Sequence, residues 1–168
     1  MGAGMKSRSD IDRNRNRSRD PHWRVGLLAA ALLLPCIASA TLGQPEASVG
    51  ADAAQLKGSV QATYLANYRV HEIQLPSGTT LREFVSLDGN VFALAWSGRA
   101  MPNLRQTLGQ YFDQYVAALQ VRRGDHRHVQ VQLDNLVVQS RGHMRGNFAG
   151  RAYLPTAIPA GVSLGDVN

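Results

Sequence analysis

The stretch VHEIQLPSGTTLREFVSLDGNVFALAW, residues 70–96, decides the fold, because it holds three apolar runs separated by two turn signals. The pair Asp88-Gly89 between two apolar runs is typical of a two-residue type I′ hairpin turn. The sequence Pro76-Ser77-Gly78 suits a three-residue loop in which glycine takes the left-handed position. The stretch therefore predicts a three-stranded antiparallel meander.

The two turns also set the register and the faces of this meander. The first turn pairs Ile73 with Leu81, Glu72 with Arg82, His71 with Glu83 and Val70 with Phe84. The second turn pairs Val85 with Phe92, Glu83 with Leu94 and Leu81 with Trp96. Because successive side chains alternate between faces, one face is mostly large and apolar, with His71, Ile73, Leu75, Leu81, Glu83, Val85, Leu87, Phe92, Leu94 and Trp96. The opposite face is thinner and more mixed, with Val70, Glu72, Arg82, Phe84, Ala93 and Ala95.

The first forty residues have the pattern of a secretory signal peptide. Residues 1–24 are polar and basic, and residues 25–40 form an apolar run that ends in Ala38-Ser39-Ala40. A basic segment, a short apolar segment and an A-x-A ending predict cleavage after Ala40, with a start at Met1 or at Met5. The apolar run has sixteen residues, fewer than the roughly 20 that a membrane-spanning helix needs. No membrane span is therefore expected after cleavage.

Charge and cysteine content narrow the classes of partner and of fold. The net charge of +6 divides into +4 before residue 41 (7 basic minus 3 acidic residues) and +2 after it (11 minus 9). The basic character thus belongs mostly to the leader, which removes the main argument for a nucleic-acid partner. The single cysteine, Cys36, also lies in the leader, and Pro35 before it argues against lipid attachment. The processed chain therefore has no disulfide.

The processed chain has the length of one domain. We expect a flexible lead-in over 41–59, in which residues 52–57 can form a short helix, a single α+β domain over 60–155, and an irregular tail over 156–168. After Pro102, apolar residues recur at spacings of three and four, which predicts one helix ending near Gly124 and covering the large apolar face. That stripe contains Leu104, Leu108, Tyr111, Phe112, Tyr115 and Leu119.

The remaining residues predict two further strands. Residues 128–138 alternate apolar and polar, Ser140-Arg141-Gly142 has a turn composition, and residues 143–154 alternate again. The predicted fold class is therefore α+β, with a three-stranded antiparallel meander, one packed helix and a C-terminal β-hairpin.

Three groups of residues could carry chemistry. In the predicted cross-strand pair of His71 and Glu83, the carboxylate could hold the histidine charged or fix its tautomer, or the two could form a structural pair. His126, His128 and His143, together with His71, could supply imidazoles to zinc or copper, although the chain lacks the usual cysteine and H-E-x-x-H patterns. His143, Arg145, Arg151 and Tyr153 fall on one face of the last strand, beside Gln130 and Gln132 if the strands pair. Guanidinium groups on a sheet can bind carboxylates or phosphates, or they can form an ordinary solvated face.

Five segments of the chain carry a resemblance to a known family. These segments are VHEIQLPSGTTLREFV, VFALAWSG, PNLRQTLGQYFDQY, LVVQSRGHMR and GRAYLP. In this order they resemble small exported proteobacterial proteins of unassigned function, the domain of unknown function 2844. The resemblance runs from about Thr41 to the end and implies export, but no activity or ligand. One departure is Arg141-Gly142-His143, where the family pattern has two glycines before the histidine, so the turn there can differ.

These observations favour an exported, non-enzymatic binding or interaction protein of the periplasm or cell envelope. The expected partner is an envelope component or an anionic ligand, without a cofactor and without nucleic acid. The sequence shows no G-x-S-x-G frame and no glycine-rich phosphate loop. The alternative is a metal-binding protein or an enzyme that uses His71 and Glu83 with nearby histidines. The sequence leaves the oligomeric state open.

Overall fold

The computed structural model describes residues 42–121, 128–143 and 147–168, except for the side chains of Asp52 and His143. The predicted leader and Cys36, His126 and Arg145 lie outside these residues. Within the described ranges, no helix is both long and apolar enough to cross a membrane.

The chain folds as an α+β domain around one antiparallel sheet of seven strands, in the order β1-β2-β3-β4-β7-β6-β5. The strands are β1 Ser59–Tyr64, β2 Tyr68–Gln74, β3 Thr79–Ser86, β4 Val91–Gly98, β5 His128–Gln132, β6 Val137–His143 and β7 Asn147–Tyr153. The helices are α1 Ala47–Gln55, α2 Leu104–Leu108 and α3 Phe112–Val121, with 3₁₀ turns η1 Gly109–Tyr111 and η2 Pro155–Ala157. The predicted α+β class is therefore confirmed. The prediction of a three-stranded meander, one helix and a separate hairpin gave too few strands and helices, because all seven described strands form one sheet.

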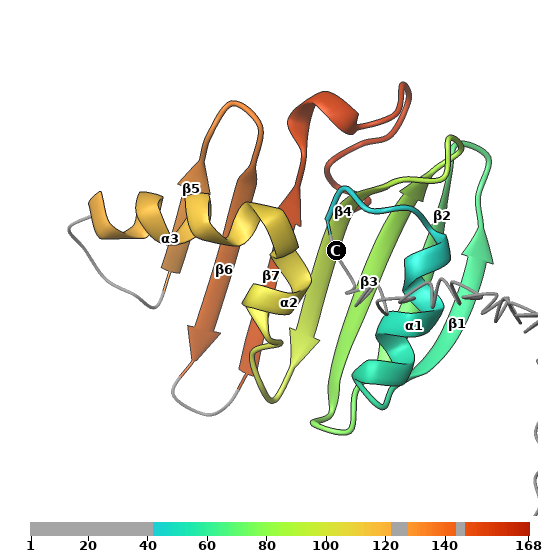
Figure 1. Cartoon of the computed structure of the whole chain (residues 1–168), viewed down its shortest axis with the longest axis horizontal. Coiled ribbons are helices and arrows are strands. Elements are labelled where there is room, and N and C mark those ends of the chain that lie inside the picture. The colour runs from blue at the N-terminus through green and yellow to red at the C-terminus, as the bar shows by residue number, and fades with distance from the viewer. Residues whose placement is uncertain (1–41, 122–127, 144–146) are drawn as a thin grey trace, which may run out of the picture. The chain divides into compact units, whose positions relative to one another are not determined.

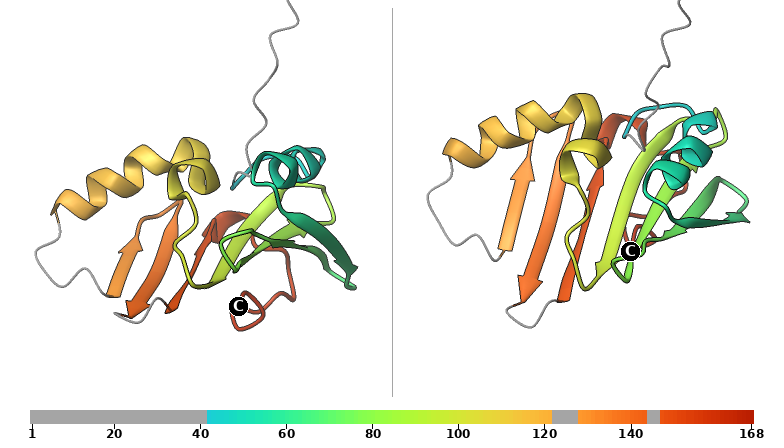
Figure 2. Two further views of the ribbon diagram at one scale, coloured as in Figure 1. Left: turned by 90° about the horizontal axis from the view of Figure 1, so that it is seen from below. Right: turned by 60° about the horizontal axis from the view of Figure 1, so that its bottom comes forward.

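The helices cover one face of this sheet, and the segment after β7 lies against the other. Figure 1 shows α1 over the end of the sheet that contains β2, and α2 and α3 over the end that contains β5 and β6. In the left view of Figure 2 the helices lie on one side of the sheet and the C-terminal residues on the opposite side. We call these the helix face and the outer face.

The first turn of the meander has the predicted register. Leu75 and Thr79 close the loop through a 2.9 Å backbone hydrogen bond, and the pairs from Ile73–Leu81 to Val70–Phe84 all form. Proline and glycine occupy the loop positions that need their backbone preferences. The local sequence is therefore enough to set this register.

The second turn is one residue longer than predicted. Ser86 and Asn90 close it, and Val85 pairs with Val91 instead of Phe92. A type I′ turn needs positive φ at both central residues, but here Gly89 has φ 81° and Asp88 keeps a negative φ. The extra residue makes a bulge that turns Phe92 to the outer face, and it leaves Leu87 exposed at the turn.

Two apolar clusters hold the layers together. The cluster on the helix face includes Ile73, Leu81, Val85, Leu94 and Trp96, and the α2–α3 stripe packs on it as predicted. The cluster on the outer face joins Phe84, Phe92, Ala93, Ala95, Val137, Tyr153 and Val167. The outer face is thus a second core beneath the C-terminal segment, and not merely a thin mixed surface.

The segment expected as a flexible lead-in contributes to the core. Helix α1 lies within it and is longer than the predicted short helix. Leu42, Val49 and Ala53 are buried in the cluster on the helix face. Pro45 also forms an isolated β-bridge with Asn90, so this segment is tied to the second turn of the meander.

The C-terminal strands also differ from the prediction. Leu133 and Leu136 close a turn through a 2.8 Å backbone hydrogen bond, so residues 128–138 are split between β5 and β6. Ser140, Arg141 and Gly142, which were expected to form a turn, lie inside β6. The connection between β6 and β7 falls at residues 144–146, outside the described residues. Strand β7 lies between β4 and β6, which joins the hairpin to the meander in one sheet.

Candidate functional site

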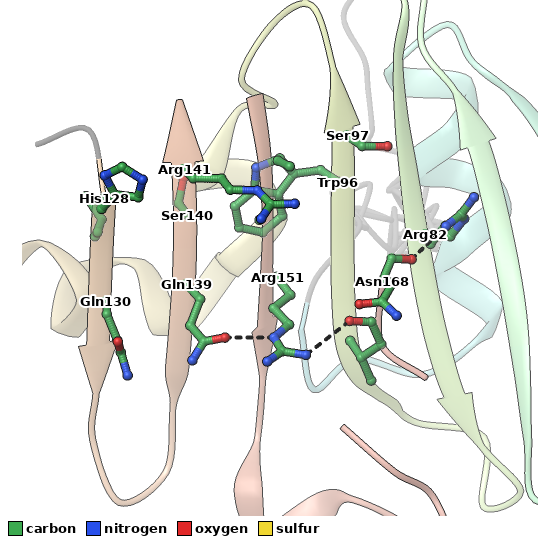
Figure 3. Close-up of a pocket in the computed structure, with 14 residues that line it drawn as sticks. Arg82, Trp96, Ser97, His128, Gln130, Gln139, Ser140, Arg141, Arg151 and Asn168 are labelled. Carbon is green, nitrogen blue, oxygen red and sulfur yellow. Dashed lines mark hydrogen bonds between the residues drawn. The ribbon is translucent and has the colours of Figure 1, made fainter. Parts of the chain in front are cut away.

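A groove of about 770 Å³ crosses the outer face of the sheet from β5 to β3 (Figure 3). Polar side chains of five strands line it, and the last two residues of the chain lie at its β3 end. The basic side chains in its lining are Arg82, His128, Arg141 and Arg151. No aspartate or glutamate is among the described residues that line it. We call this feature the basic groove.

Strand register places the lining side chains in two rows. One row runs across four strands through His128, Arg141, Ala149 and Ser97. The next row runs through Gln130, Gln139, Arg151, Ala95 and Arg82. Residues that pair across strands present their side chains on the same face. Ala149 and Ala95 have small side chains, so the longer arginine side chains beside them extend above the surface of the sheet.

The three arginines differ in their partners. Arg82 donates through Nε to Glu72 Oε2 at 2.8 Å and through Nη1 to the backbone oxygen of Asn168 at 2.7 Å. Arg151 donates through Nε to Gln139 Oε1 at 2.8 Å and through Nη1 to the Leu164 oxygen at 2.6 Å. The guanidinium of Arg141 is exposed and makes no hydrogen bond or ion pair within the described part of the chain.

Of the three arginines in the groove, Arg82 alone pairs with an acidic side chain of the described residues. The hydrogen bond from Arg82 lowers the pKa of Glu72 below its ordinary value, against an opposing effect of partial burial and with help from Gln74. Glu72 is therefore ionised at neutral pH and offsets the charge of Arg82. Arg151 bonds only to neutral oxygens, and Arg141 has the free guanidinium. The positive charge of the groove is concentrated on β6 and β7.

Gly150 allows the side chain of Trp96 to pack closely against β7 beneath this groove. A Cβ atom at Gly150 would lie 2.4 Å from Cζ2 of Trp96 and 2.6 Å from the backbone oxygen of Gln139. Trp96 is buried in the cluster on the helix face. The absence of a side chain at Gly150 therefore lets the indole ring lie against β7, directly under the groove.

The predicted anion patch is only partly assembled as expected. Arg151 lies in the basic groove, and the neighbouring Tyr153 is buried in the outer cluster. His143 ends β6 and pairs in register with Asn147, so it is not on the same strand as Arg151. Gln130 lines the groove from β5, with Gln139 of β6 between it and Arg151. Arg145 falls outside the described residues.

Arg141 and Gln139 line the groove, although neither was predicted as a site residue. The composition Ser140-Arg141-Gly142 indicated a turn, which removed Arg141 from consideration as a strand residue. The alternation of Val137, Gln139 and Arg141 against Val138 and Ser140 was the signal that could have placed both on a strand face. Glu72 and Arg82 do form the cross-strand surface pair that the register predicted.

His71 and Glu83 pair in register as predicted. The hydrogen bond of the His71 side chain, however, is made with Glu46, which lies outside the meander. Nε2 of His71 lies 2.8 Å from Oε1 of Glu46, and the other Glu46 oxygen accepts a hydrogen bond from Arg69. Glu83 is fully buried on the helix face. Glu46 lies 25 residues before His71, in the segment expected to be flexible, so no local pattern indicated this cluster.

Among the residues that the structure describes, His71 and His128, two of the histidines of the alternative hypothesis, lie far apart. His71 faces the helix side on β2, whereas His128 lines the outer groove on β5, at the other end of the strand order. Among the residues that the structure describes, no three metal-ligating side chains come together. The side chain of His143 and the whole of His126 lie outside that description.

The Glu46 cluster predicts a pH dependence of stability. Burial raises the pKa of Glu46, but hydrogen bonds and charges from His71 and Arg69 outweigh it, so the pKa falls below its ordinary value of 4.5. A carboxylate with a lowered folded pKa stabilises the fold above the unfolded pKa and loses that contribution as pH falls through the folded pKa. We expect Glu46→Gln to cost about 1 kcal/mol at pH 7. The difference should vanish as pH falls below 4.5.

Urea unfolding at a series of pH values measures this effect. Asp113→Asn is a matched control, because the side chain of Asp113 is 90% exposed and 3.8 Å from its nearest cation. Equal stability of Glu46→Gln and the unmodified protein at pH 7 would contradict the assignment.

Comparison with known proteins places the chain in a family without assigning it an activity. A family model described as "Protein of unknown function (DUF2844)" matches residues 38–167. No curated protein and no solved structure shows significant similarity to the chain. The family match covers all seven strands and the three α-helices. The chain therefore belongs to the protein family of unknown function DUF2844.

Proposed function

We propose that this protein is an exported, non-enzymatic binding protein of the periplasm or cell envelope, and that its basic groove binds an anionic ligand. The observation that carries the binding proposal is the free guanidinium of Arg141, beside Arg151, in a groove lined by no described acidic side chain. Planar guanidinium groups bind carboxylates and phosphates through paired, charge-assisted hydrogen bonds.

Export is proposed from the leader. Residues 1–40 combine a basic segment, a sixteen-residue apolar run and a final Ala-Ser-Ala, which is the pattern of a cleaved signal peptide. N-terminal sequencing of the protein recovered from the periplasmic fraction should begin at Thr41. A protein recovered from the cytoplasm with residues 1–40 attached would contradict export.

The geometry of the groove favours binding over catalysis. Its lining includes the hydroxyl group of Ser97 on β4 and the imidazole of His128 on β5. These two residues stand at opposite ends of one row, with β7 and β6 between them. Three strand spacings separate them by about 14 Å. A histidine must lie within hydrogen-bond reach of a serine to activate it, so this pair does not form a nucleophile and base.

A titration followed by the fluorescence of Trp96 tests the binding proposal. Trp96 is the only tryptophan after residue 41, and it lies at the groove floor. We expect the processed protein to bind at least one anion from a panel of oligoglutamate, oligogalacturonate and inorganic phosphate. Arg141→Ala should weaken that binding about 10- to 100-fold, because it removes one charge-assisted pair.

Arg105→Ala is the matched control for this titration. It removes the same charge, but Arg105 lies on α2, is 72% exposed and contacts Phe112 and Asp113 outside the groove. Its affinity should equal that of the unmodified protein. Equal weakening by both substitutions, or no binding to any member of the panel, would contradict the proposed site.

A further inference from the structure

The C-terminal segment, residues 158–168, occupies one end of the basic groove. Nη1 of Arg151 donates to the backbone oxygens of Leu164 at 2.6 Å and Val167 at 3.4 Å. Nη1 of Arg82 donates to the backbone oxygen of Asn168 at 2.7 Å. Figure 3 shows Arg82 and Arg151 both reaching toward these last residues. Two of the groove's arginines therefore already hold a stretch of peptide by its backbone.

Three aliphatic side chains of this segment pack on the outer cluster, with Val167 buried in it and Ile158 and Val162 partly buried against it. Val167 is only 1% exposed, and it belongs to the cluster that contains Phe84 and Ala95. Leu164, three residues earlier, is 36% exposed. The segment forms no strand with the sheet. It is therefore held by guanidinium contacts to its backbone, by the burial of Val167 and by the partial burial of Ile158 and Val162.

The segment brings no acidic side chain to the arginines. Its one acidic side chain, Asp166, accepts a 3.0 Å hydrogen bond from the backbone nitrogen of Ser163, within the segment itself. Hydrogen bonds from guanidinium to carboxylate are about twice as strong as those between neutral groups. Among the described residues, Arg151 and Arg141 have no carboxylate partner. A peptide that brought an acidic side chain to these two arginines would therefore bind the groove more strongly than the segment does.

We propose that the ligand of the basic groove is an acidic, extended peptide segment of a partner protein, which displaces the C-terminal segment. This inference rests on the proposed function and specifies its ligand. The partner peptide places a small aliphatic side chain in the socket of Val167 and backbone oxygens at Arg82 and Arg151. Its carboxylate pairs with the guanidinium groups, including the free one of Arg141. The C-terminal segment is then a built-in competitor that only a more acidic peptide displaces.

Full-length processed protein with a loosened C-terminal segment tests this proposal. Val167→Asn puts a polar amide into the apolar socket without adding a carboxylate, and it should release the segment. The probes are two amidated, fluorescein-labelled peptides, Ser-Leu-Gly-Asp-Val-Asn and the same peptide with glutamate in the last place. By fluorescence anisotropy, Val167→Asn should bind the glutamate peptide at least tenfold more tightly than the unmodified protein does. It should also prefer the glutamate peptide to the asparagine peptide.

Two further variants keep the test decisive. Ala160→Asn adds the same polar side chain to the same segment at an exposed position, and it should bind the peptides as the unmodified protein does. Val167→Ala should give a smaller gain in affinity for the glutamate peptide. It replaces Val167→Asn as the test variant if circular dichroism shows that Val167→Asn is poorly folded.

The outcomes separate this inference from the proposed function. If neither Val167 variant binds the peptides more tightly than the unmodified protein, the inference is overturned. Loss of oligogalacturonate binding in Arg141→Ala would then still support an anion site, with a glycan as its ligand. If Arg141→Ala leaves all binding unchanged, the proposed function fails as well.

Discussion

Replacing Phe84 with alanine should lower the free energy of unfolding by about 3–5 kcal/mol, the range for removal of a buried aromatic ring. Phe84 is buried in the outer cluster, where its ring centroid lies 6.1 Å from that of Tyr68 and 6.3 Å from that of Phe92. Val167 of the C-terminal segment belongs to the same cluster. The substitution therefore leaves a cavity between the sheet and this segment.

Urea denaturation followed by Trp96 fluorescence measures the loss. Val60→Ala is the control, since Val60 lies on the edge strand β1 and is 38% exposed. A substitution at such a surface position should stay within about 0.5 kcal/mol. If Phe84→Ala costs no more than Val60→Ala, the outer face is not a packed second core.

Replacing Gly150 with alanine should cost about 3 kcal/mol, near the upper end of the usual range for overpacking. The added methyl group meets the ring of Trp96 at 2.4 Å and the backbone oxygen of Gln139 at 2.6 Å. Gln139 is held in the β6–β7 ladder opposite Arg151, so its oxygen cannot move without breaking strand pairing. The indole ring must shift instead, and the emission spectrum of Trp96 should change with it.

Gly50→Ala is the matched control for this substitution. Gly50 lies inside α1, and a Cβ atom there would have no neighbour within 4 Å. Alanine is favoured over glycine inside a helix by about 1 kcal/mol, so Gly50→Ala should stabilise the protein. Equal effects of the two substitutions would contradict the close contact between β7 and Trp96.

The first turn of the meander shows what local sequence can predict. Pro76 and Gly78 suit one loop geometry, and every residue pair outward from the loop then follows by counting. The second turn shows the limit of that method. Asp88-Gly89 matched a shorter turn, and a difference of one residue was enough to move Phe92 to the other face. Strand register changes face with every single-residue shift.

The bounds of the C-terminal strands were predicted wrongly for a related reason. Alternation continues from residue 128 to residue 138, so the pattern resembled one strand, although Asp134-Asn135 contains turn-forming residues. The composition of Ser140-Arg141-Gly142 predicted the turn instead, but these residues lie inside β6. The error concealed Arg141, and the basic groove could not be assembled from the sequence.

By itself, the sequence determined the local features of this protein: the first hairpin, the faces of its strands, the helical stripe after Pro102 and the pattern of an export signal. These depend on backbone preferences and periodicities within a few residues. Only the tertiary structure decided the strand order that inserts β7 beside β4, the contact of Glu46 with His71, and the contacts of Arg82 and Arg151 with the last residues of the chain. These contacts join residues 16 to 86 positions apart. Their formation depends on the packing of whole layers, which no local pattern encodes.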